Sequence, residues 1–516
     1  MPGGFVHFEI EITVHSLEDQ HVLILGLGAS GLAMARWCAR CGAQVTVADT
    51  RAAPPQLAAL QRELPSARFV SGPFDATLVL GGSVCAVFKS PGLAPSALAE
   101  VLQSARVAGL WVGGELSLFS QALADLKSER GYCPKVLAVT GTNGKTTVTS
   151  LTGQLLVRAG KTVAVAGNIG PTLLDTLSAQ LKASTLPEVW VLELSSFQLD
   201  AEKTFEPSAG AVLNITQDHL DWHGSMSAYS AAKAAVFGQH GLLVLNRDDP
   251  VVMALLPAPV RGKQQRQQVR DYVTFGSDLP KRAGDFGLES VNGMVWLVRA
   301  LASDETPRKG AVPELHLQRL LPADVLPIRG RHNLLNALAA LALAGVADAA
   351  LGPLLYGLRD YRGEPHRVES VGIFDAVEYF DDSKGTNVGA TVAALNSLGA
   401  ERKVVVILGG EGKGQDFAPL AQPIQRYARA VLLIGRDAPL LRAALAGSGV
   451  ALLEAASMAQ AVALAKCQAQ AGDAVLMSPA CASFDMFDNY EHRARVFRQA
   501  VLELAAGAGL ELEHAS

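Results

Sequence analysis

The chain has 516 residues, of which 49% are apolar, with a net charge of −5 and six cysteines. This length allows two to four domains with cores of their own, and the charge offers no electrostatic reason to bind nucleic acid. No apolar stretch reaches the length of a membrane span, the first residues lack the pattern of a signal peptide, and so few cysteines form no disulfide framework; we expect a cytoplasmic protein without membrane insertion.

The first predicted domain opens with a strand, a glycine-rich turn and a helix. His21–Leu25 is an apolar run, and Gly26–Gly31 follows it with the pattern Gly-x-Gly-x-x-Gly. After an alanine-rich helix, a second predicted strand, Gln44–Ala48, ends at Asp49, 18 positions beyond the last glycine of the turn. This spacing is the fingerprint of a dinucleotide-type βαβ unit.

The rest of this domain carries weaker signals. Cys38 and Cys41 form a C-x-x-C pair within the predicted helix, but no second pair follows at zinc-finger spacing, so we interpret them as small buried residues. Val84–Phe88 is a predicted strand that leads into Ser90. The polar stretch Ala124–Pro134 is interpreted as a linker.

A phosphate-binding loop opens the second predicted domain. Val136–Val139 is an apolar strand, and residues 140–147 read Thr-Gly-Thr-Asn-Gly-Lys-Thr-Thr. Such a loop presents backbone N–H groups and the positive end of a helix to phosphate oxygens. Lys145 would reach the outer phosphates and Thr146 would offer its hydroxyl to Mg²⁺. Val139 replaces the first glycine of the common spacing, yet we predict ATP or GTP binding over an ordinary strand–helix turn.

Strands and helices alternate through the rest of this domain, which predicts a parallel sheet covered by helices on both faces. The predicted strands are Thr162–Ala166, Val189–Leu194, Ala211–Ile215 and Leu242–Leu245. The pattern breaks down between about residues 258 and 315, where the basic run Arg261–Arg266 is interpreted as a solvated loop rather than a partner surface. Asn333–Gly345 is a predicted helix.

Several polar residues follow these strands, where open α/β sheets bind ligands. Glu193 ends a strand and would bind Mg²⁺, unless it is a charge that points into solvent. Asn168 would touch a phosphate or cap a turn. The run Asn214–His223 holds two histidines and two aspartates, which suggests metal or phosphate binding rather than surface polarity. Composition alone makes Lys233 a lysine on a helix surface.

A third predicted domain begins near His366 and repeats the α/β rhythm. Its predicted strands are Val404–Leu408, Val431–Ile434 and Ala474–Met477, and its closing helix is Asp488–Ala505. We therefore predict an α/β protein of three domains in series, at residues 1–130, 131–365 and 366–516.

Taken in order, these segments resemble the Mur ligase superfamily, the ATP-dependent amino-acid ligases of peptidoglycan assembly and folate polyglutamylation. The shared motifs are Gly141–Thr147, Glu193, His219, Lys233 and Arg331–Asn336. Three more stretches resemble the member that adds D-glutamate to UDP-N-acetylmuramoyl-L-alanine: Gly26–Gly31 with Asp49–Arg51, Asp382–Asn387, and Ser478–Asp485. The resemblance covers roughly residues 20–505.

The resemblance implies a Rossmann-like N-terminal domain for the UDP-linked substrate, a central P-loop-type ATPase domain and a Rossmann-like C-terminal domain for the amino acid. Implied ATP-binding residues are Gly141, Thr142, Asn143, Gly144, Lys145, Thr146, Thr147, Asn333, Asn336, Arg367 and Asp382. Implied UDP-substrate residues are Ala29, Ser30, Asp49, Thr50, Arg51, Ser90 and Asn168. Implied D-glutamate residues are Lys384, Thr386, Lys413, Ser483 and Phe484. Without the resemblance, Ser483 would be interpreted as a cap of the last helix and Lys384 as a solvated turn residue.

Two Mg²⁺ ions are also implied, one held by Thr146 and Glu193 and the other by His219 and Lys233. Because an ammonium cannot ligate a cation, Lys233 would carry a carbamate derived from CO₂. Lys145, Glu193, His219 and Lys233 would be the catalytic residues. ATP would phosphorylate the substrate carboxylate, and the amine of D-glutamate would displace phosphate from the acyl phosphate. We expect the chain to act as a monomer.

Other functions remain open at this point. A nicotinamide-dependent dehydrogenase would use Gly26–Gly31 and Asp49, but it leaves the phosphate loop unexplained. Another Mur or folylpolyglutamate-type ligase would explain the central domain equally well, but not Asp382–Asn387 together with Ser478–Asp485. A non-enzymatic P-loop regulator would need the phosphate loop alone.

Overall fold

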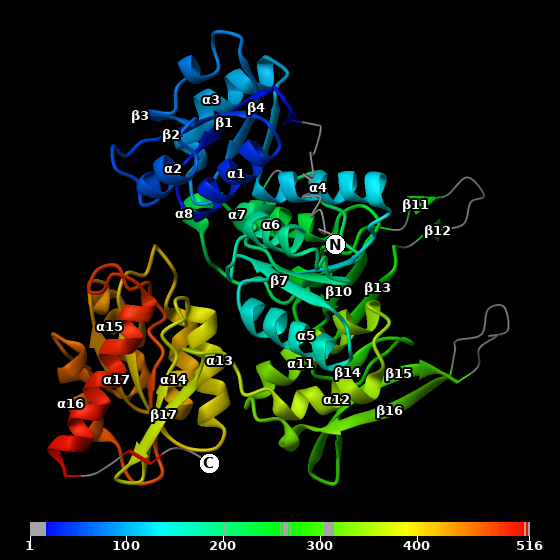
Figure 1. The fold of residues 1–516 in the computed structure, drawn as a ribbon. Coiled ribbons are helices and arrows are strands. Elements are labelled where there is room, and N and C mark those ends of the chain that lie inside the picture. Colours follow the sequence, from blue (N-terminus) through cyan, green and yellow to red (C-terminus); the bar gives the residue numbers. More distant parts are fainter. Residues whose placement is uncertain are drawn as a thin grey trace, which may run out of the picture. The chain divides into compact units, whose positions relative to one another are not determined.

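The computed structural model describes residues 17–200, 202–258, 260–261, 267–268, 270–303, 314–509 and 512–513. Within these residues the strands form three large sheets and one two-stranded pair, and helices alternate with most of the strands (Figure 1). The α/β class is confirmed. The chain divides into two compact units: the first is Met1–Thr140, Gly160–Gly210 and Ala231–Leu242, and the second is Gly141–Ala159, Ala211–Ser230 and Leu243–Ser516.

The first sheet is parallel, with the strand order β3-β2-β1-β4-β5. Its strands are β1 (His21–Leu25), β2 (Gln44–Asp49), β3 (Arg68–Ser71), β4 (Val84–Lys89) and β5 (Trp111–Gly114), and its helices are α1 (Ala29–Arg40), α2 (Leu57–Glu63) and α3 (Pro95–Val107). The order reverses beside β1, so the carboxyl ends of β1 and β4 form the switch point at which such sheets bind ligands.

The cysteine prediction for this domain is confirmed. Cys38 and Cys41 are buried in and just after α1. All six cysteines lie in the described part of the chain and are free thiols. Burial raises the pKa of the Cys38 thiol far above its usual range. Because the thiolate is the reactive form and the metal ligand, we interpret the pair as packing residues rather than as a redox or metal motif.

The predicted linker at Ala124–Pro134 is wrong for most of its length. Helix α4 runs over Glu115–Arg130 and ends at Gly131, whose φ of 66° terminates it in the left-handed region. The apolar side of α4 is buried, and Phe119 packs edge-on against Trp190 with 5.1 Å between ring centroids. A helix with one buried side keeps a polar outer side, and that polar composition suggested a linker.

The middle sheet has nine strands in the order β16-β15-β14-β13-β10-β9-β6-β8-β7. Its strands are β6 (Lys135–Thr140), β7 (Val163–Gly167), β8 (Val189–Glu193), β9 (Ala209–Val212), β10 (Leu242–Asn246), β13 (Tyr272–Phe275), β14 (Phe286–Val291), β15 (Met294–Ala302) and β16 (Leu315–Pro322). Its helices are α5 (Lys145–Arg158), α6 (Leu173–Ala183), α7 (Ser196–Leu199), α8 (Leu220–His223), α9 (Met226–Ala234), α10 (Pro250–Met253), α11 (Arg331–Val346) and α12 (Leu351–Asp360). Strands β6, β7 and β8 pair in parallel, as do β10 and β13.

The described residues of the region in which the predicted pattern broke down are largely in strands. The region holds β13, β14 and β15, and β14, β15 and β16 pair in antiparallel fashion (Figure 1). Antiparallel strands with one solvated face show less continuous hydrophobicity than buried parallel strands, which explains why they were missed. The two-stranded pair is β11 (Val260–Arg261) with β12 (Gln267–Gln268); the rest of the predicted loop Arg261–Arg266 lies outside the described residues.

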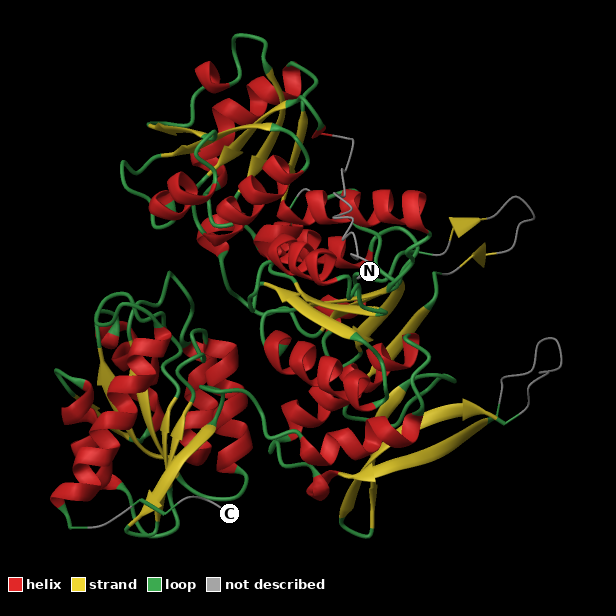
Figure 2. Ribbon diagram, in the orientation of Figure 1, coloured by secondary structure: helices red, strands yellow, loops and turns green. Residues whose placement is uncertain are grey.

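The third sheet has the order β17-β18-β22-β19-β20-β21, parallel except for β17. Its elements are β17 (Glu369–Phe374), β18 (Val377–Asp381), α13 (Val388–Gly399), β19 (Val404–Gly409), α14 (Ala421–Tyr427), β20 (Ala428–Ile434), α15 (Ala438–Leu445), β21 (Ala451–Glu454), α16 (Met458–Gln468), β22 (Ala474–Met477) and α17 (Tyr490–Gly507). Alternate residues of β19 join two separate cores, one with α13, α14 and α15 and the other with α16 and α17. Helices therefore cover both faces, as Figure 2 shows.

The hairpin β17–β18 was not predicted because its turn lacks a sequence signal. Asp375 and Ala376 both have positive φ, 54° and 56°, as a two-residue type I′ turn requires. That turn usually has the sequence Asn-Gly or Asp-Gly, so the Asp-Ala pair at residues 375–376 does not predict it.

No helix among the described residues is both long and apolar enough to cross a bilayer.

Candidate active site

The glycine turn of the first unit closes tightly around one backbone oxygen. Gly26, with φ of 88°, donates from its N–H to Ala48 O at 2.7 Å, and Ser90 Oγ donates to Gly26 O at 2.9 Å. A Cβ on Gly31 would lie 2.0 Å from the same oxygen, so only glycine lets α1 approach the turn. The N-cap of α1 is Gly28, which offers no side-chain cap. The first N–H groups of the helix can therefore serve an anion.

The carboxylate of Asp49 is fully hydrogen-bonded within the protein. It is 1% exposed and accepts from Leu27 N at 2.7 Å and from Arg51 N, Nε and Nη2 at 2.9, 2.8 and 2.8 Å. A carboxylate has about four lone-pair sites, and these four donors fill them. The hydrogen bonds from Arg51 hold the pKa of Asp49 down at about 2. In a dinucleotide-binding fold the acid at this place accepts from ribose hydroxyls, so this arrangement favours a structural Asp49 that orients the half-exposed Arg51.

Glu115 is a buried carboxylate at the same switch point that the sequence reading missed. It begins α4 directly after β5, is 3% exposed, and accepts from Leu174 N at 3.1 Å. It is also hydrogen-bonded to the side chain of Ser30, and burial raises its pKa. Glu115 thus ties the start of α1 to the start of α6. A carboxylate that follows a strand and a glycine pair was the available signal.

Glu193 ends β8 and is 2% exposed, so its interpretation as a solvent-exposed charge is wrong. Its Oε1 accepts from Asn168 Nδ2 at 2.8 Å, and Asn168 N donates to Glu193 O at the same distance. Its Oε2 is buried and, within the described part of the chain, has no hydrogen-bond partner. A buried carboxylate oxygen without a donor is costly and has the hard-ligand chemistry that Mg²⁺ prefers. Glu193 Oε2 therefore fits the role of a Mg²⁺ ligand.

Lys233 is the second residue whose surface interpretation is wrong. It lies near the end of α9 and is 1% exposed, among the largest fully buried side chains of the protein. Burial of an ammonium is unfavourable, and conversion of the amine into a carbamate would change both its charge and its ligand chemistry. Lys233 is therefore not a solvated surface lysine.

The phosphate loop lies in the second unit and depends on its glycines. Gly141 and Gly144 have φ of 152° and 85°, and a Cβ on Gly144 would lie 2.7 Å from Asn336 Oδ1. Lys145 Nζ donates to Gly141 O at 3.0 Å and to Thr142 O at 2.9 Å. The ammonium therefore lies over the loop, where it would meet phosphate oxygens.

Two further elements of the second unit contact this loop. Asn336 Nδ2 donates to Asn333 Oδ1 at 3.0 Å, so both side chains lie on one face of α11. Arg367 Nη2 donates to Thr146 Oγ1 at 2.6 Å. Asp382 is buried and accepts from Ser478 Oγ at 2.6 Å, and burial raises the pKa of Asp382 to about 7.

His219 lies at the start of α8 with φ of 54°. Its Nε2 is 3.5 Å from Asp218 Oδ2, and its ring meets the Tyr229 ring edge-on, with 6.4 Å between centroids. The Tyr229 hydroxyl is 3.2 Å from Thr142 Oγ1. The loop of His219 is thus joined to the phosphate loop through Tyr229.

The implied D-glutamate residues come from three turns of the third sheet. Lys384 Nζ lies 3.8 Å from the centroid of the Tyr490 ring, so it is not simply solvated. Ser483 is 3% exposed, and the cap of α17 is Asn489, so the helix-cap interpretation of Ser483 is wrong. The remaining members are Thr386, half-buried, Lys413, with φ of 52°, and Phe484, 67% exposed. Glu411 and Ala482 exchange backbone hydrogen bonds of 3.0 and 2.9 Å, which join two of the turns.

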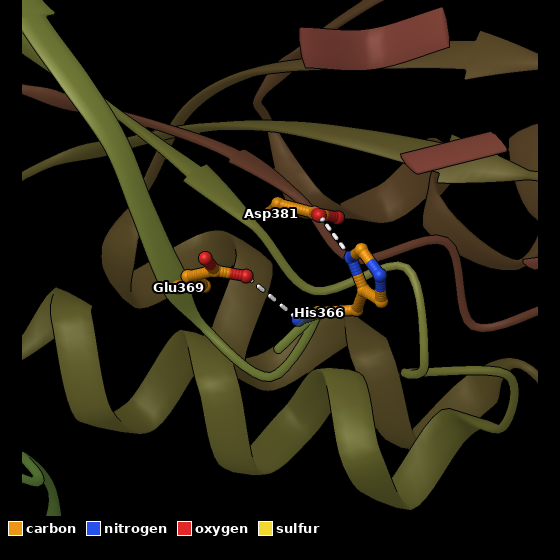
Figure 3. Close-up of side chains that lie close together, drawn as sticks. All are labelled: His366, Glu369 and Asp381. Atoms are coloured by element: carbon orange, nitrogen blue, oxygen red, sulfur yellow. Dashed lines mark hydrogen bonds and ion pairs between the residues drawn. The ribbon is translucent and has the colours of Figure 1, made fainter. Parts of the chain in front are cut away.

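His366, Glu369 and Asp381 form a cluster beside these turns (Figure 3). His366 Nδ1 is 2.7 Å from Asp381 Oδ2, and His366 N donates to Glu369 Oε2 at 2.9 Å. Arg498 pairs with both carboxylates. Because a guanidinium already neutralises the acids, we interpret the cluster as an ion-pair network rather than a metal site.

Three family models match the chain in order. They are the Mur ligase MurD-like N-terminal domain at residues 20–114, the Mur ligase middle domain at 139–344, and the Mur ligase glutamate ligase domain at 366–481. Each of the three matched segments contains one of the large sheets in whole or in most of its strands.

Known proteins of this family are similar along almost the whole length. The UDP-N-acetylmuramoylalanine--D-glutamate ligase of Albidiferax ferrireducens is 75% identical, over 98% of this chain and 100% of that protein. The enzyme of the same name from Polaromonas sp. is 58% identical, over 96% and 100%. Among solved structures, the Thermotoga maritima UDP-N-acetylmuramate-alanine ligase MurC covers 94% of this chain and 99% of its own, with a TM-score of 0.52 and 21% identity. The MurF ligase of the same organism, in complex with ADP, covers 95% and 97%, with a TM-score of 0.54 and 16% identity. These two structures show the shared fold. The family models and the sequence relatives establish that the chain belongs to the Mur ligase family, in the group of the UDP-N-acetylmuramoylalanine--D-glutamate ligases.

Proposed function

We propose that this protein joins D-glutamate to UDP-N-acetylmuramoyl-L-alanine with cleavage of ATP to ADP and phosphate, a step of peptidoglycan precursor synthesis. The observation that carries the proposal is the 75% identity, over 98% of the chain, to a ligase named for this reaction. The match of three Mur ligase domain models in order supports it. We expect a monomer that acts in the cytoplasm, where ATP is available.

The chemistry requires an activated carboxylate. A carboxylate is a poor electrophile because oxide is a poor leaving group. Transfer of the γ-phosphoryl group of ATP to a carboxylate oxygen forms an acyl phosphate and ADP. The D-glutamate amine then adds to the carbonyl carbon, and the tetrahedral intermediate expels phosphate and loses a proton to leave the amide. Phosphoryl transfer depends mainly on positioning and charge neutralisation.

The phosphate loop supplies much of that positioning. Backbone N–H groups of residues 141–147 and the start of α5 would hold the phosphates, with Lys145 as their counter-charge. Asn333, Asn336, Arg367 and Asp382 would complete the ATP site. Mg²⁺, when bound, neutralises phosphate charge; Thr146, Glu193, His219 and a carbamylated Lys233 would hold two such ions. Two observations support these roles: Glu193 Oε2 has no hydrogen-bond partner in the part of the chain that the structure describes, and Lys233 is buried.

The first unit would bind the UDP-linked substrate. Ala29 and Ser30 start α1, and Thr50, Arg51, Ser90 and Asn168 follow strand ends of the same unit. Arg51 would contact the diphosphate, while Asp49, with its acceptors already used, would hold Arg51 in place. With Asp49 positioning Arg51 and Arg51 contacting the diphosphate, a dinucleotide-type fingerprint would bind a nucleotide sugar.

D-Glutamate would be bound by the third sheet. Its two carboxylates need cations and hydroxyl donors, while its amine must stay free to attack. Lys384, Thr386, Lys413, Ser483 and the N–H of Phe484 offer that set of donors from three strand-to-helix turns.

Phosphate release is expected to need ATP, Mg²⁺, UDP-N-acetylmuramoyl-L-alanine and D-glutamate together. Acyl phosphate formation requires the first three, and turnover requires an amine to discharge the intermediate. A phosphate assay in which each component is omitted in turn tests the proposal. Equal phosphate release with ATP and Mg²⁺ alone would show a simple nucleotidase, and replacement of D-glutamate by another amino acid at full rate would place the protein elsewhere in the family.

Arg51→Ala is expected to weaken binding of the UDP-linked substrate about ten- to hundredfold, since a charge-assisted hydrogen bond to the diphosphate is lost. Calorimetry with this substrate and, separately, with NADH measures the effect. Arg62→Ala is a matched control, because Arg62 is an exposed arginine of the same unit that pairs with Glu63. Tight NADH binding by the wild-type protein without binding of the UDP-linked substrate would reveal a dehydrogenase instead.

A further inference from the structure

Arg493 is a buried cation that neither the motifs nor the proposed mechanism uses. It lies in the first turn of α17 and is 0% exposed. A fully buried guanidinium is unusual unless it is paired or hydrogen-bonded. Its Nε is buried and has no hydrogen-bond partner among the described residues, and burial lowers its pKa to about 10. Burial of this guanidinium is energetically unfavourable, which indicates that Arg493 has a specific role.

The hydrogen bonds of Arg493 go to backbone oxygens of two different loops. Nη2 donates to Ser383 O at 2.8 Å, and Nη1 donates to Cys481 O at 3.1 Å. Ser383 directly precedes Lys384, and Cys481 stands two residues before Ser483. One planar guanidinium therefore spans the loop Asp382–Asn387 and the loop Ser478–Asp485, which together carry most of the residues assigned to D-glutamate.

The two loops also touch each other directly. Ala480 N donates to Gly385 O at 2.9 Å, and Ser478 Oγ donates to Asp382 Oδ2 at 2.6 Å. These bonds join the loops at two points, Asp382 with Ser478 and Gly385 with Ala480. The bonds of Arg493 lie beside Lys384 and Ser483, so they restrain the parts of the loops that would face the amino acid.

Helix α17 reaches Lys384 a second time. Tyr490 lies one helical turn before Arg493, on the same side of the helix, and its ring lies 3.8 Å from Lys384 Nζ. The start of α17 is itself fixed, because the Asn489 side chain accepts from His492 N at 2.7 Å. The first turn of α17 thus orients both the backbone and the ammonium of this loop.

We propose that Arg493 is a positioning residue for D-glutamate: its two hydrogen bonds hold the loops Asp382–Asn387 and Ser478–Asp485 in one arrangement, and this arrangement sets the affinity for the incoming amino acid. The inference rests on the proposed function. Arg493 itself does not touch the substrate; it acts through Lys384 and Ser483. A fixed geometry matters here because a displacement of about 1 Å in a binding group costs up to about a hundredfold in activity.

Two variants test the role. Arg493→Met keeps the volume and removes both donors, and Arg493→Lys keeps the charge but lacks the planar fork that reaches two oxygens at once. The KM for D-glutamate is expected to rise about ten- to hundredfold in Arg493→Met and less in Arg493→Lys. The KM for UDP-N-acetylmuramoyl-L-alanine, whose assigned residues lie in the first unit, should stay within about twofold.

A matched control separates positioning from lost stability. Arg429 belongs to the same sheet and pairs with Asp473, with Nη2 to Oδ1 at 3.0 Å, and no contact of Arg429 with either loop is found among the described residues. Arg429→Met should lower the melting temperature without changing the KM for D-glutamate. Lys384→Ala provides the reference for a direct loss of substrate contact.

The outcomes distinguish this inference from the proposed function. Wild-type protein without D-glutamate-dependent phosphate release would overturn the proposed function. Wild-type activity together with an unchanged KM for D-glutamate in Arg493→Met, or equal rises of all three substrate KM values, would overturn the positioning role. If neither Arg493 variant folds, Arg493 supports the domain rather than the loops, and the inference is likewise wrong.

Discussion

Lys233→Ala is expected to reduce ligase turnover by at least about a hundredfold, as loss of a group that orients charge in the transition state does. Lys233 is 1% exposed, and a carbamate on its amine would replace a buried cation by an anion that a metal ion can accept. Acetate or formate, added at high concentration, should restore part of the activity of the variant because a small carboxylate replaces the lost anion. Initial rates of phosphate release with and without the acid measure both effects.

Lys203→Ala is the matched control, since Lys203 is an exposed lysine of the same unit. It should retain wild-type rates and show no response to acetate. A mass increase of one CO₂ on the intact wild-type protein in bicarbonate, absent from the Lys233→Ala variant, gives a readout that does not depend on activity. Near-normal turnover of Lys233→Ala at low bicarbonate would contradict the role of Lys233.

Lys145→Ala is the second substitution for which we expect a large loss, about 10²- to 10³-fold in kcat, because the counter-charge of the transferring phosphoryl group is removed. In the structure Lys145 Nζ already lies over the phosphate loop, 3.0 Å from Gly141 O and 2.9 Å from Thr142 O. Lys145→Arg should recover little, since a planar guanidinium does not replace a compact ammonium in a closed loop. Steady-state kinetics with ATP as the varied substrate measure the loss.

Binding of the UDP-linked substrate offers the control for this variant. Its assigned residues lie in the first unit, so calorimetry should give a wild-type affinity for Lys145→Ala and show that the protein is folded. Lys182→Ala, an exposed lysine on α6, should behave as wild type in both assays. A Lys145→Ala protein with an unchanged kcat would mean that ATP binds elsewhere.

Local features of the chain were sufficient to predict many of its elements. The strands β1, β6 and β22 and the helices α1 and α11 are apolar runs or periodic patterns bounded by glycines, and the structure confirms them within a few residues. The structure gives a reason for the glycines of the two motifs: Gly26, Gly141 and Gly144 have positive φ, which disfavours any residue with a Cβ. Such properties depend on a residue and its immediate neighbours, so sequence is enough to find them.

The prediction of secondary structure from sequence failed where the signal depends on what packs against a segment. Helix α4 looked like a linker because its buried side packs on residues far along the chain, such as Trp190. Strands β14 to β16, which pair in antiparallel fashion, were missed because a solvated face interrupts their apolar pattern. The sequence of a segment alone specifies neither the residues against which a helix packs nor the exposure of a strand.

The state of the polar residues was decided by tertiary structure alone. The motifs singled out Glu193, Lys233 and Asp49, but composition favoured an exposed Glu193 and a surface Lys233, and left the partners of Asp49 undefined. The fold buries all three. Among the described residues no group donates a hydrogen bond to Glu193 Oε2, whereas the carboxylate of Asp49 accepts hydrogen bonds from Leu27 and Arg51. Arg493 carried no sequence signal, because its two acceptors are backbone oxygens of Ser383 and Cys481, which any residue type would present. The desolvation and hydrogen bonding of a charged group are set by distant segments that fold around it, and these set its chemistry.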